Sequence, residues 1–367
     1  MLAERLTAQL LAGEPARDPL AVAERLLAIQ GQDPRGARLA IRSRTAGLSA
    51  ADVDRALSEQ RTLVISSLNR GTLHLVRSED YHWLHALTSP GSFTSNARRL
   101  AEEGVSPDDA ERGVKALARA LAQEGPLTRH QLRERIAAVG VATEGQAIVH
   151  LLLLASLRGL IVRGPMVGGR HAFVLVHDWL GDSPPVDRDR ALAELARRYL
   201  LGHAPADERD LAKWSGLPLR DVRSGLSSIA SHITERPDGL LELTGHGPAA
   251  ALPPPRLLGA FDPVLLGWRS REAILGGHQG VVTVNGLFRP FALIRGRAVA
   301  TWRMPGGEVV LEPFARLSRT DRVALAEDAR DVLRFLGGEG LDTREAKPTP
   351  LVVRPSAGPA GDPTGKR

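Results

Sequence analysis

One pattern recurs along the chain and limits the folds open to it: short amphipathic helices are followed by a hairpin rich in Gly and Arg. The first hairpin is predicted over residues 62–76, with a turn at Asn69-Arg70-Gly71. The second is predicted over residues 160–176 and the third over residues 232–244. Helices followed by a two-stranded wing are the composition of a winged helix-turn-helix module. We therefore expect an α+β fold with three such modules in tandem.

Apolar residues at helical spacing predict the helices of each repeat. In the first repeat they predict a helix over residues 20–30, followed by helices near residues 37–44 and 51–59. In the third repeat, Gly216 marks the turn of a helix–turn–helix pair, and Pro218 stands near the first position of the second helix.

The character of the sequence changes after three consecutive prolines at residues 253–255. Residues 280–314 have the alternation and turns of a β-meander, and a closing helix is expected after Ser318, a good N-cap. Later residues are rich in Pro and Gly, which predicts a flexible tail. The predicted domains are three modules at 1–109, 110–185 and 186–250, a β-rich C-terminal domain with its closing helix at 251–341, and the tail at 342–367.

Composition restricts the chemistry that is open to the chain. There is no Cys among the 367 residues, which excludes disulfides, thiolate zinc sites and a Cys nucleophile. The 11 His are scattered without carboxylate neighbours, so we expect no metal and no cofactor. A net charge of +6 permits a nucleic-acid partner without requiring one. Nearly all of the positive charge is Arg, which suits phosphate recognition but is also what GC-rich codon usage would give.

No segment of the sequence predicts a membrane span or a secretion signal. The longest apolar run, residues 148–157, is about half of the ~20 residues that a membrane-spanning helix needs. The first residues carry charges within their apolar stretch and lack a signal-peptide core. We expect a cytoplasmic protein.

Two glutamines, Gln30 and Gln32, stand one residue apart where the first helix is expected to end. Their spacing alone favours an ordinary solvated helix end, because short patterns often match by chance. The alternative is a pair of catalytic amides beside a phosphate-binding face. Asp33-Pro34 is typical of a turn that starts the next helix.

Five blocks of the sequence together resemble the AlkZ/YcaQ-like family of bacterial tandem winged-helix DNA glycosylases. The resemblance covers about residues 1–340, with the blocks in the family's order. The blocks are AIQGQDPRGARLAIRSR (28–44), NRGTLHLV (69–76), KWSGLPLRDVR (213–223), GAFDPVLLGWRSR (259–271) and GRAVATWR (296–303).

The resemblance implies that Gln30 and Gln32 are the catalytic residues. The family motif has Gln or His, one intervening residue, and then Gln or Asp. The branch with Gln at both positions protects producers of DNA-alkylating natural products. The intervening residue is usually apolar, whereas here it is Gly31, which we expect to loosen the backbone and to affect rate and precision more than reaction class.

The implied activity is that of a monofunctional DNA glycosylase that hydrolyses the N-glycosidic bond of alkylated purines. N7-alkylguanine and interstrand crosslinks are the expected substrates, in base excision repair or in self-resistance. An amide cannot take up a proton at neutral pH, so two glutamines suit a base that already carries a positive charge. One amide oxygen, that of Gln32, would orient water and the other would contact the sugar. No Lys lies near the pair in the sequence, so we expect no Schiff base and no lyase activity.

The expected partner is double-stranded DNA with alkylated bases, held by a monomer at the nucleoid. Arg42, Arg44, Arg70, Arg163 and Arg170 stand where winged modules meet phosphates, although each could equally be a solvated surface arginine.

Thr72 and His74 complete the predicted DNA-contacting set. We expect them to support the wall of the active site, unless they simply share one face of a strand. The sequence shows no aromatic-rich pocket. The resemblance to the branch with two glutamines implies limited base flipping, because bulky adducts would not fit a snug pocket. Two other classes stay open: a non-catalytic winged-helix DNA-binding protein such as a transcriptional regulator, and a protein–protein scaffold.

Overall fold

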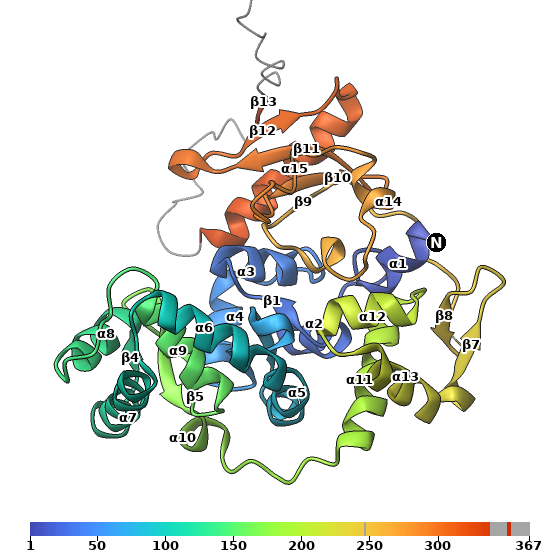
Figure 1. Cartoon of the computed structure of the whole chain (residues 1–367). Coiled ribbons are helices and arrows are strands. Elements are labelled where there is room, and N and C mark those ends of the chain that lie inside the picture. Colours follow the sequence, from blue (N-terminus) through green and yellow to red (C-terminus); the bar gives the residue numbers. More distant parts are fainter. Residues whose placement is uncertain (246, 338–350, 354–367) are drawn as a thin grey trace, which may run out of the picture.

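The computed structural model describes residues 1–245, 247–337 and 351–353. The first repeat lies at the centre, with the second and third repeats on opposite sides of it and the C-terminal β-rich domain above (Figure 1). The fold mixes helices and strands, as expected for the α+β class. None of the helices in the described part of the chain is both long and apolar enough to cross a membrane.

The first repeat contains the predicted hairpin. Arg70 and Gly71 in its turn have φ angles of 57° and 70°. A short strand, β1, lies next to the hairpin and pairs with its second strand. The elements are α1 (Leu2–Ala8), α2 (Pro19–Leu26), β1 (Ile29–Gln30), α3 (Pro34–Arg42), α4 (Ala50–Ser58), β2 (Leu63–Ser67), β3 (Leu73–Arg77), α5 (Tyr81–Thr88) and α6 (Phe93–Glu102).

The second repeat shares a sheet with the first. The strand order β1-β3-β2-β5-β6-β4 joins both hairpins in six strands, with Ile65 opposite Arg163 where they meet. The predicted boundary near residue 110 therefore does not separate two independent sheets. The elements are α7 (Pro107–Glu124), β4 (Leu127–Thr128), α8 (Arg129–Ala137), α9 (Ala147–Leu157), β5 (Ile161–Val167), β6 (Arg170–Leu175) and α10 (Val176–Leu180).

The third repeat has its own two-stranded sheet. Gly216 ends the first helix of the predicted helix–turn–helix pair in the left-handed conformation, and Pro218 immediately precedes the second helix. The elements are α11 (Arg188–His203), α12 (Glu208–Ser215), α13 (Leu219–Ser228), β7 (Ile233–Glu235) and β8 (Leu241–Leu243). Helices followed by a hairpin thus recur three times, while the assignment of each repeat as a winged helix stays a prediction.

The C-terminal domain is a five-stranded sheet with the order β13-β12-β11-β10-β9. Only part of the expected meander forms, because residues 280–290 contain a single isolated bridge, between Val282 and Phe288, instead of two strands. Ser318 caps the closing helix, as predicted. The elements are β9 (Arg256–Leu258), α14 (Glu272–Leu275), β10 (Phe291–Ile294), β11 (Arg297–Arg303), β12 (Val310–Pro313), α15 (Arg319–Leu336) and β13 (Val352–Val353).

The predicted flexible tail, 342–367, lies outside the described residues except for 351–353. There the prediction is wrong, since β13 pairs in parallel with β12.

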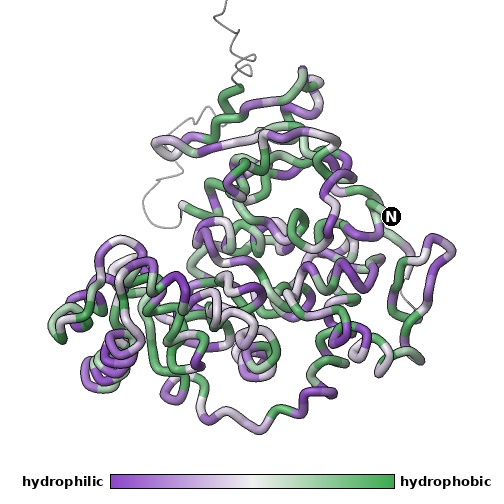
Figure 2. The backbone as a smooth tube through the Cα atoms, viewed as in Figure 1, coloured by the Kyte–Doolittle hydropathy of each residue, from purple (hydrophilic) through white to green (hydrophobic). Residues whose placement is uncertain are grey.

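The first repeat and the C-terminal domain share a core. Ile29, Leu257 and Phe335 are buried in one apolar cluster, and hydrophobic segments run through the interior in Figure 2. Helix α3 approaches the backbone after β9 so closely that a Cβ on Gly36 would lie 2.2 Å from the carbonyl oxygen of Ala260. This contact needs glycine at position 36, and it holds the segment after β9 against the start of α3.

Candidate active site

The two glutamines do not lie at a helix end, contrary to the prediction. Helix α2 stops at Leu26, because Leu27 adopts a left-handed φ of 64°. The chain then forms β1, in which Gln30 lies opposite His74 of β3. The backbone N–H of Gly31 donates to the carbonyl of Leu73 at 2.7 Å. The pair therefore sits at the edge of the six-stranded sheet, where a ladder fixes its backbone.

Gln30 is buried, and its amide oxygen accepts no hydrogen bond from the described part of the chain. The residue is 7% exposed, and Oε1 has no hydrogen-bond partner among the described residues. An unpaired buried carbonyl costs free energy unless a ligand or water satisfies it. Gln30 lines a cavity of about 190 Å³. The other lining residues are Arg70, Lys213, Phe261, Leu266, Trp268, Arg271, Gly286 and Phe288.

This cavity brings together four of the five sequence blocks. Gln30, Arg70, Lys213 and the 261–271 segment are far apart in the sequence but line one space. The absence of an aromatic-rich pocket, expected from the sequence, is wrong here. The rings of Phe261 and Phe288 are 5.3 Å apart between centroids, and both residues are half-buried.

The described walls of the Gln30 cavity are cationic. Arg70 donates to the backbone carbonyl of Lys213 at 2.8 Å. Arg271 donates to the carbonyl of Leu265 at 2.7 Å and lies 5.0 Å from the ring centroid of Phe288. Burial lowers the pKa of Arg70 and of Arg271, but arginine stays charged at neutral pH. Neither guanidinium is paired with a carboxylate of the described residues, so both charges are available to an anion.

Gln32 is exposed and lines a different cavity, of about 130 Å³, between β2, α9 and β5. The N–H of Leu73 donates to its Oε1 at 3.3 Å, which orients the amide. The sequence predicted both glutamines in one site, whereas in the structure the two side chains line different cavities. Asp33 caps α3 by accepting from the N–H of Arg35 at 3.1 Å, the structural role expected for it.

The prediction that Arg42 and Arg44 contact DNA is corrected by the structure. Arg44 has no exposed surface, and its guanidinium donates to both carboxylate oxygens of Asp262, at 2.8 and 3.0 Å. The Arg42 side chain is 4% exposed and pairs with Asp328 and Asp331 of α15. Sequence spacing could not distinguish these internal ion pairs from a phosphate-binding face.

The Arg44–Asp262 pair positions the Gln30 cavity. Asp262 also accepts from the N–H of Val264 at 3.0 Å, and so shapes the turn that follows Phe261. Trp268, beyond this turn, is 3% exposed and donates to the carbonyl of His203 at 2.9 Å. One internal arginine thus fixes the segment that carries two walls of the cavity.

Thr72 and His74 hold the hairpin turn. Thr72 Oγ1 donates to the carbonyl of Asn69 at 3.0 Å. His74 is 3% exposed, and its Nδ1 lies 2.9 Å from the carbonyl of Thr72. Burial, reinforced by the charge of Arg70, lowers the pKa of His74 to about 3, so the ring is neutral and Nδ1 donates to that carbonyl. A neutral, buried ring cannot serve as a cationic DNA contact, whereas it does support the wall beside Gln30.

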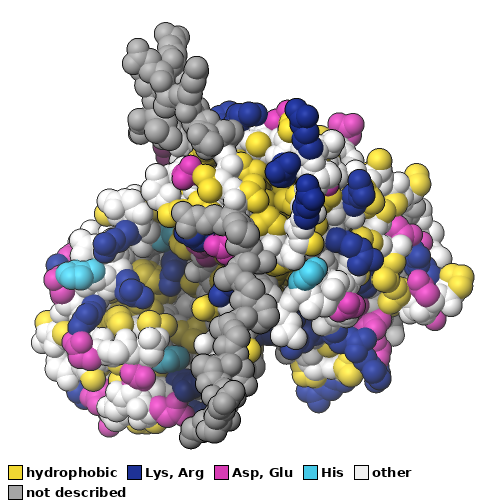
Figure 3. Space-filling model, turned by 90° about the horizontal axis from the view of Figure 1, so that it is seen from above, with side chains coloured by type: hydrophobic (Ala, Val, Ile, Leu, Met, Phe, Trp, Pro, Cys, Tyr) yellow, Lys and Arg dark blue, Asp and Glu magenta, His cyan; other side chains and the backbone are white. Residues whose placement is uncertain are grey.

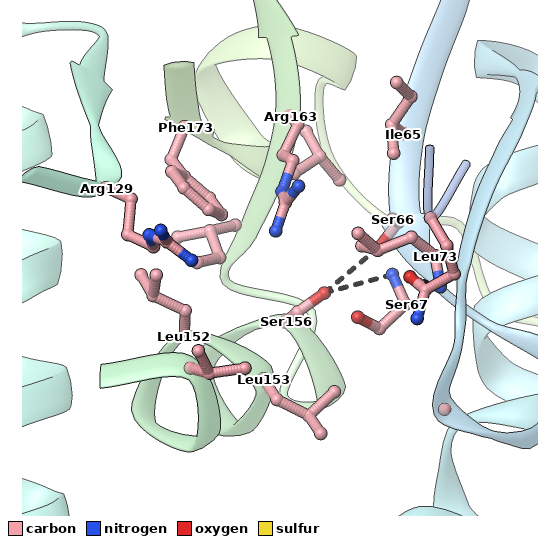
Figure 4. A pocket seen from close by; sticks show the side chains of 15 residues that line it. Ile65, Ser66, Ser67, Leu73, Arg129, Leu152, Leu153, Ser156, Arg163 and Phe173 are labelled. Carbon is pink, nitrogen blue, oxygen red and sulfur yellow. Dashed lines mark hydrogen bonds between the residues drawn. The ribbon is translucent and has the colours of Figure 1, made fainter. Parts of the chain in front are cut away.

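The other predicted DNA contacts lie on the second repeat. Arg163 is half-buried and lines the Gln32 cavity, with its guanidinium 4.9 Å from the ring centroid of Phe173 (Figure 4). Arg170 is exposed at the start of β6. Both line a larger groove between α3, α8 and the β5–β6 hairpin. Within the described chain no group of three or more His, Asp or Glu could hold a metal ion.

Comparison with known proteins agrees with the five blocks. The model of a family described as "DNA glycosylase AlkZ-like" matches residues 23–335. An interstrand DNA cross-link repair glycosylase from Streptomyces sahachiroi is 28% identical over 358 residues, covering 90% of this chain and 95% of that protein. The solved structure of the Streptomyces sahachiroi DNA glycosylase AlkZ superposes with a TM-score of 0.76 at 25% identity, over 96% of this chain and 98% of that one.

Proposed function

The chain belongs to the AlkZ-like DNA glycosylase family, and from this premise we propose that it releases alkylated purines, above all N7-alkylguanine, from duplex DNA. Interstrand crosslinks joined through such bases are a second proposed substrate, because the relative with 28% identity is named an interstrand cross-link repair glycosylase. The buried, unpaired Oε1 of Gln30 in a cationic cavity is the observation that carries the proposal.

The proposed reaction needs no general acid. An N7-alkylated guanine is already a cation, so the electron pair of the C1′–N9 bond leaves with the base and neutralises it. Water then forms the new C1′–O bond and loses a proton to solvent. Gln30 Oε1 would face the electron-poor sugar, and Gln32, oriented by Leu73, would align the water.

A matched pair of variants tests this assignment. Gln30→Ala combined with Gln32→Ala should abolish release of N7-methylguanine from a 25-mer duplex while leaving DNA affinity within about threefold. Gln123→Ala, on an exposed position of α7, should release the base at the wild-type rate. Undiminished release by the double variant would overturn the catalytic assignment. If the wild-type protein bound DNA but released no base, a non-catalytic DNA-binding protein would be the better description.

The proposed role in the cell is repair of nucleoid DNA or self-resistance. Expression in a glycosylase-deficient bacterial strain should raise survival under an N7-alkylating agent, and the double variant should not. Survival equal to that of the empty vector would contradict this role. Protection against a bifunctional agent in addition to a monofunctional one would support crosslinks as substrates.

A further inference from the structure

Arg163 lies at the junction of two cavities. It lines the small cavity that Gln32 also lines, and it lines the groove of about 980 Å³ between α3, α8 and the β5–β6 hairpin. Arg129, at the start of α8, and Phe173 of β6 line both spaces as well. In Figure 4 the side chains of Arg129 and Arg163 extend from different elements into the same cavity.

The guanidinium of Arg163 forms no ion pair with any residue that the structure describes. Its Nε is buried without a hydrogen-bond partner among the described residues, and none of those that line the small cavity is acidic. Burial, with the nearby charge of Arg129, lowers the pKa of Arg163 to about 10, so the group is still a cation at neutral pH. A half-buried cation without a carboxylate partner is incompletely solvated, and an anion in the cavity would stabilise it.

Hydroxyl groups stand where an anion would need further donors. Ser66 and Ser156 lie on β2 and α9, with their Oγ atoms 3.2 Å apart. The N–H of Ser67 donates to Ser156 Oγ at 3.4 Å (Figure 4). Serine hydroxyls rotate freely enough to donate to a phosphate oxygen. A volume of about 130 Å³ has room for one tetrahedral anion.

The adjoining groove is positively charged and could bind further phosphates of the same strand. Asp54 is the one acidic residue among its described lining, and Arg38 already pairs with it. The remaining lining arginines are Arg35, Arg129, Arg133, Arg163 and Arg170, of which Arg133 pairs with Glu144 outside the lining. On the face seen from above, Lys and Arg side chains stand among hydrophobic ones, with Asp and Glu side chains between them (Figure 3). A row of cations leading away from a single-anion cavity suits a phosphodiester chain better than an isolated phosphate ion.

We propose that Arg163 and Arg129 hold one backbone phosphodiester of the damaged DNA in the small cavity, and that the strand continues along the groove. This rests on the proposed function, because it assumes that DNA is the substrate. The phosphate would lie beside Gln32 and fix the register of the strand relative to the water-aligning amide. The hydroxyls of Ser66 and Ser156 would complete its coordination.

A methylphosphonate scan tests whether the small cavity binds one phosphate of the DNA backbone. Each phosphate within four nucleotides of an N7-methylguanine is replaced in turn by a neutral methylphosphonate, and Kd is measured by fluorescence anisotropy. At one position the wild-type protein should lose about tenfold in affinity, the typical worth of a hydrogen bond to a charged group. The same replacement should leave the Kd of Arg163→Gln unchanged.

Matched variants make the result interpretable. Arg129→Gln, at an exposed position, should show the same coupling even if Arg163→Gln fails to fold by circular dichroism. Arg119→Gln removes an exposed arginine of α7 that lines neither cavity, and should keep the tenfold loss. If each methylphosphonate lowered the DNA affinity of all variants equally, phosphate binding in the small cavity would be refuted, while the proposed function would stand.

Two further results would refute different parts of the account. Millimolar inorganic phosphate could stabilise the wild-type protein but not Arg163→Gln, while no methylphosphonate affects the two proteins differently. This result would mean that the cavity binds free phosphate, and it would overturn the proposal. Failure of the wild-type protein to bind any duplex at low salt would overturn both the proposed function and the proposed phosphate site.

Discussion

Replacing Arg44 tests whether this arginine is an internal support or a DNA contact. Its guanidinium makes two bonds to Asp262 and donates to the carbonyls of Gln9 and Ala40, at 2.8 and 2.9 Å, and both members of the ion pair are fully buried. Arg44→Met would leave a buried carboxylate without its partner, so the free energy of unfolding should fall by about 3–5 kcal/mol. Arg44→Met with Asp262→Asn should recover part of this loss, because no uncompensated charge remains.

The assay for Arg44 is urea unfolding monitored by tryptophan fluorescence, together with the salt dependence of DNA binding. Arg17→Met is the control, since the Arg17 side chain is 83% exposed and its pair with Asp18 should contribute less than about 1 kcal/mol. The slope of log Kd against log salt should be the same for Arg44→Met and wild type. If the stability loss were no larger than that of the control and the slope of log Kd against log salt fell by about 0.9, Arg44 would be a DNA contact and the reasoning would be refuted.

Three further predictions follow from the site. Gly31→Ala should keep the fold and raise the free energy of unfolding by about 0.4–1 kcal/mol in urea unfolding, because the new Cβ would lie 3.4 Å from Ile65 Cγ2 at a φ that alanine tolerates; a loss above 2 kcal/mol would show that the site needs glycine. The folded-state pKa of His74, about 3, lies below the usual 6.5, so the unfolded chain binds a proton there first, and His74 alone should lower stability as pH drops below about 6.5, by up to about 1.4 kcal/mol per pH unit. His74→Gln should reduce the slope of stability against pH in urea unfolding at pH 6.5, 5.5 and 4.5, and an unchanged slope would contradict the burial argument. Borohydride should trap no covalent complex with abasic DNA; trapping that Lys213→Arg abolishes would show a lyase, since Lys213 is the lysine that the fold brings to the Gln30 cavity.

The sequence predicted the recurring elements well because their signals are local. The turn at Asn69-Arg70-Gly71, the left-handed Gly216 and the cap at Ser318 each depend on a few adjacent residues. The joined six-stranded sheet could not be predicted in this way. It depends on the pairing of Ile65 with Arg163, almost 100 residues apart.

The site was predictable in its residue types but not in its geometry. Gln30 and Gln32 came from the family resemblance, whereas the helix expected to carry them ends four residues before Gln30 because Leu27 has a left-handed φ. Arg44 could not be recognised as buried without Asp262, its partner 218 positions later. Phe261, Phe288 and Lys213 were missed for the same reason, since only the fold brings them to Gln30.

The central claim is that two amides, without a general acid, release a base that already carries its own charge. Single-turnover release of N7-methylguanine, a cation, and of O6-methylguanine, a neutral base, from the same duplex tests this directly. We predict release of N7-methylguanine at least about 100-fold faster, because general acid catalysis typically contributes 10²–10⁴-fold and neither glutamine amide can supply it to the neutral base. Release of both bases at similar rates would contradict the account.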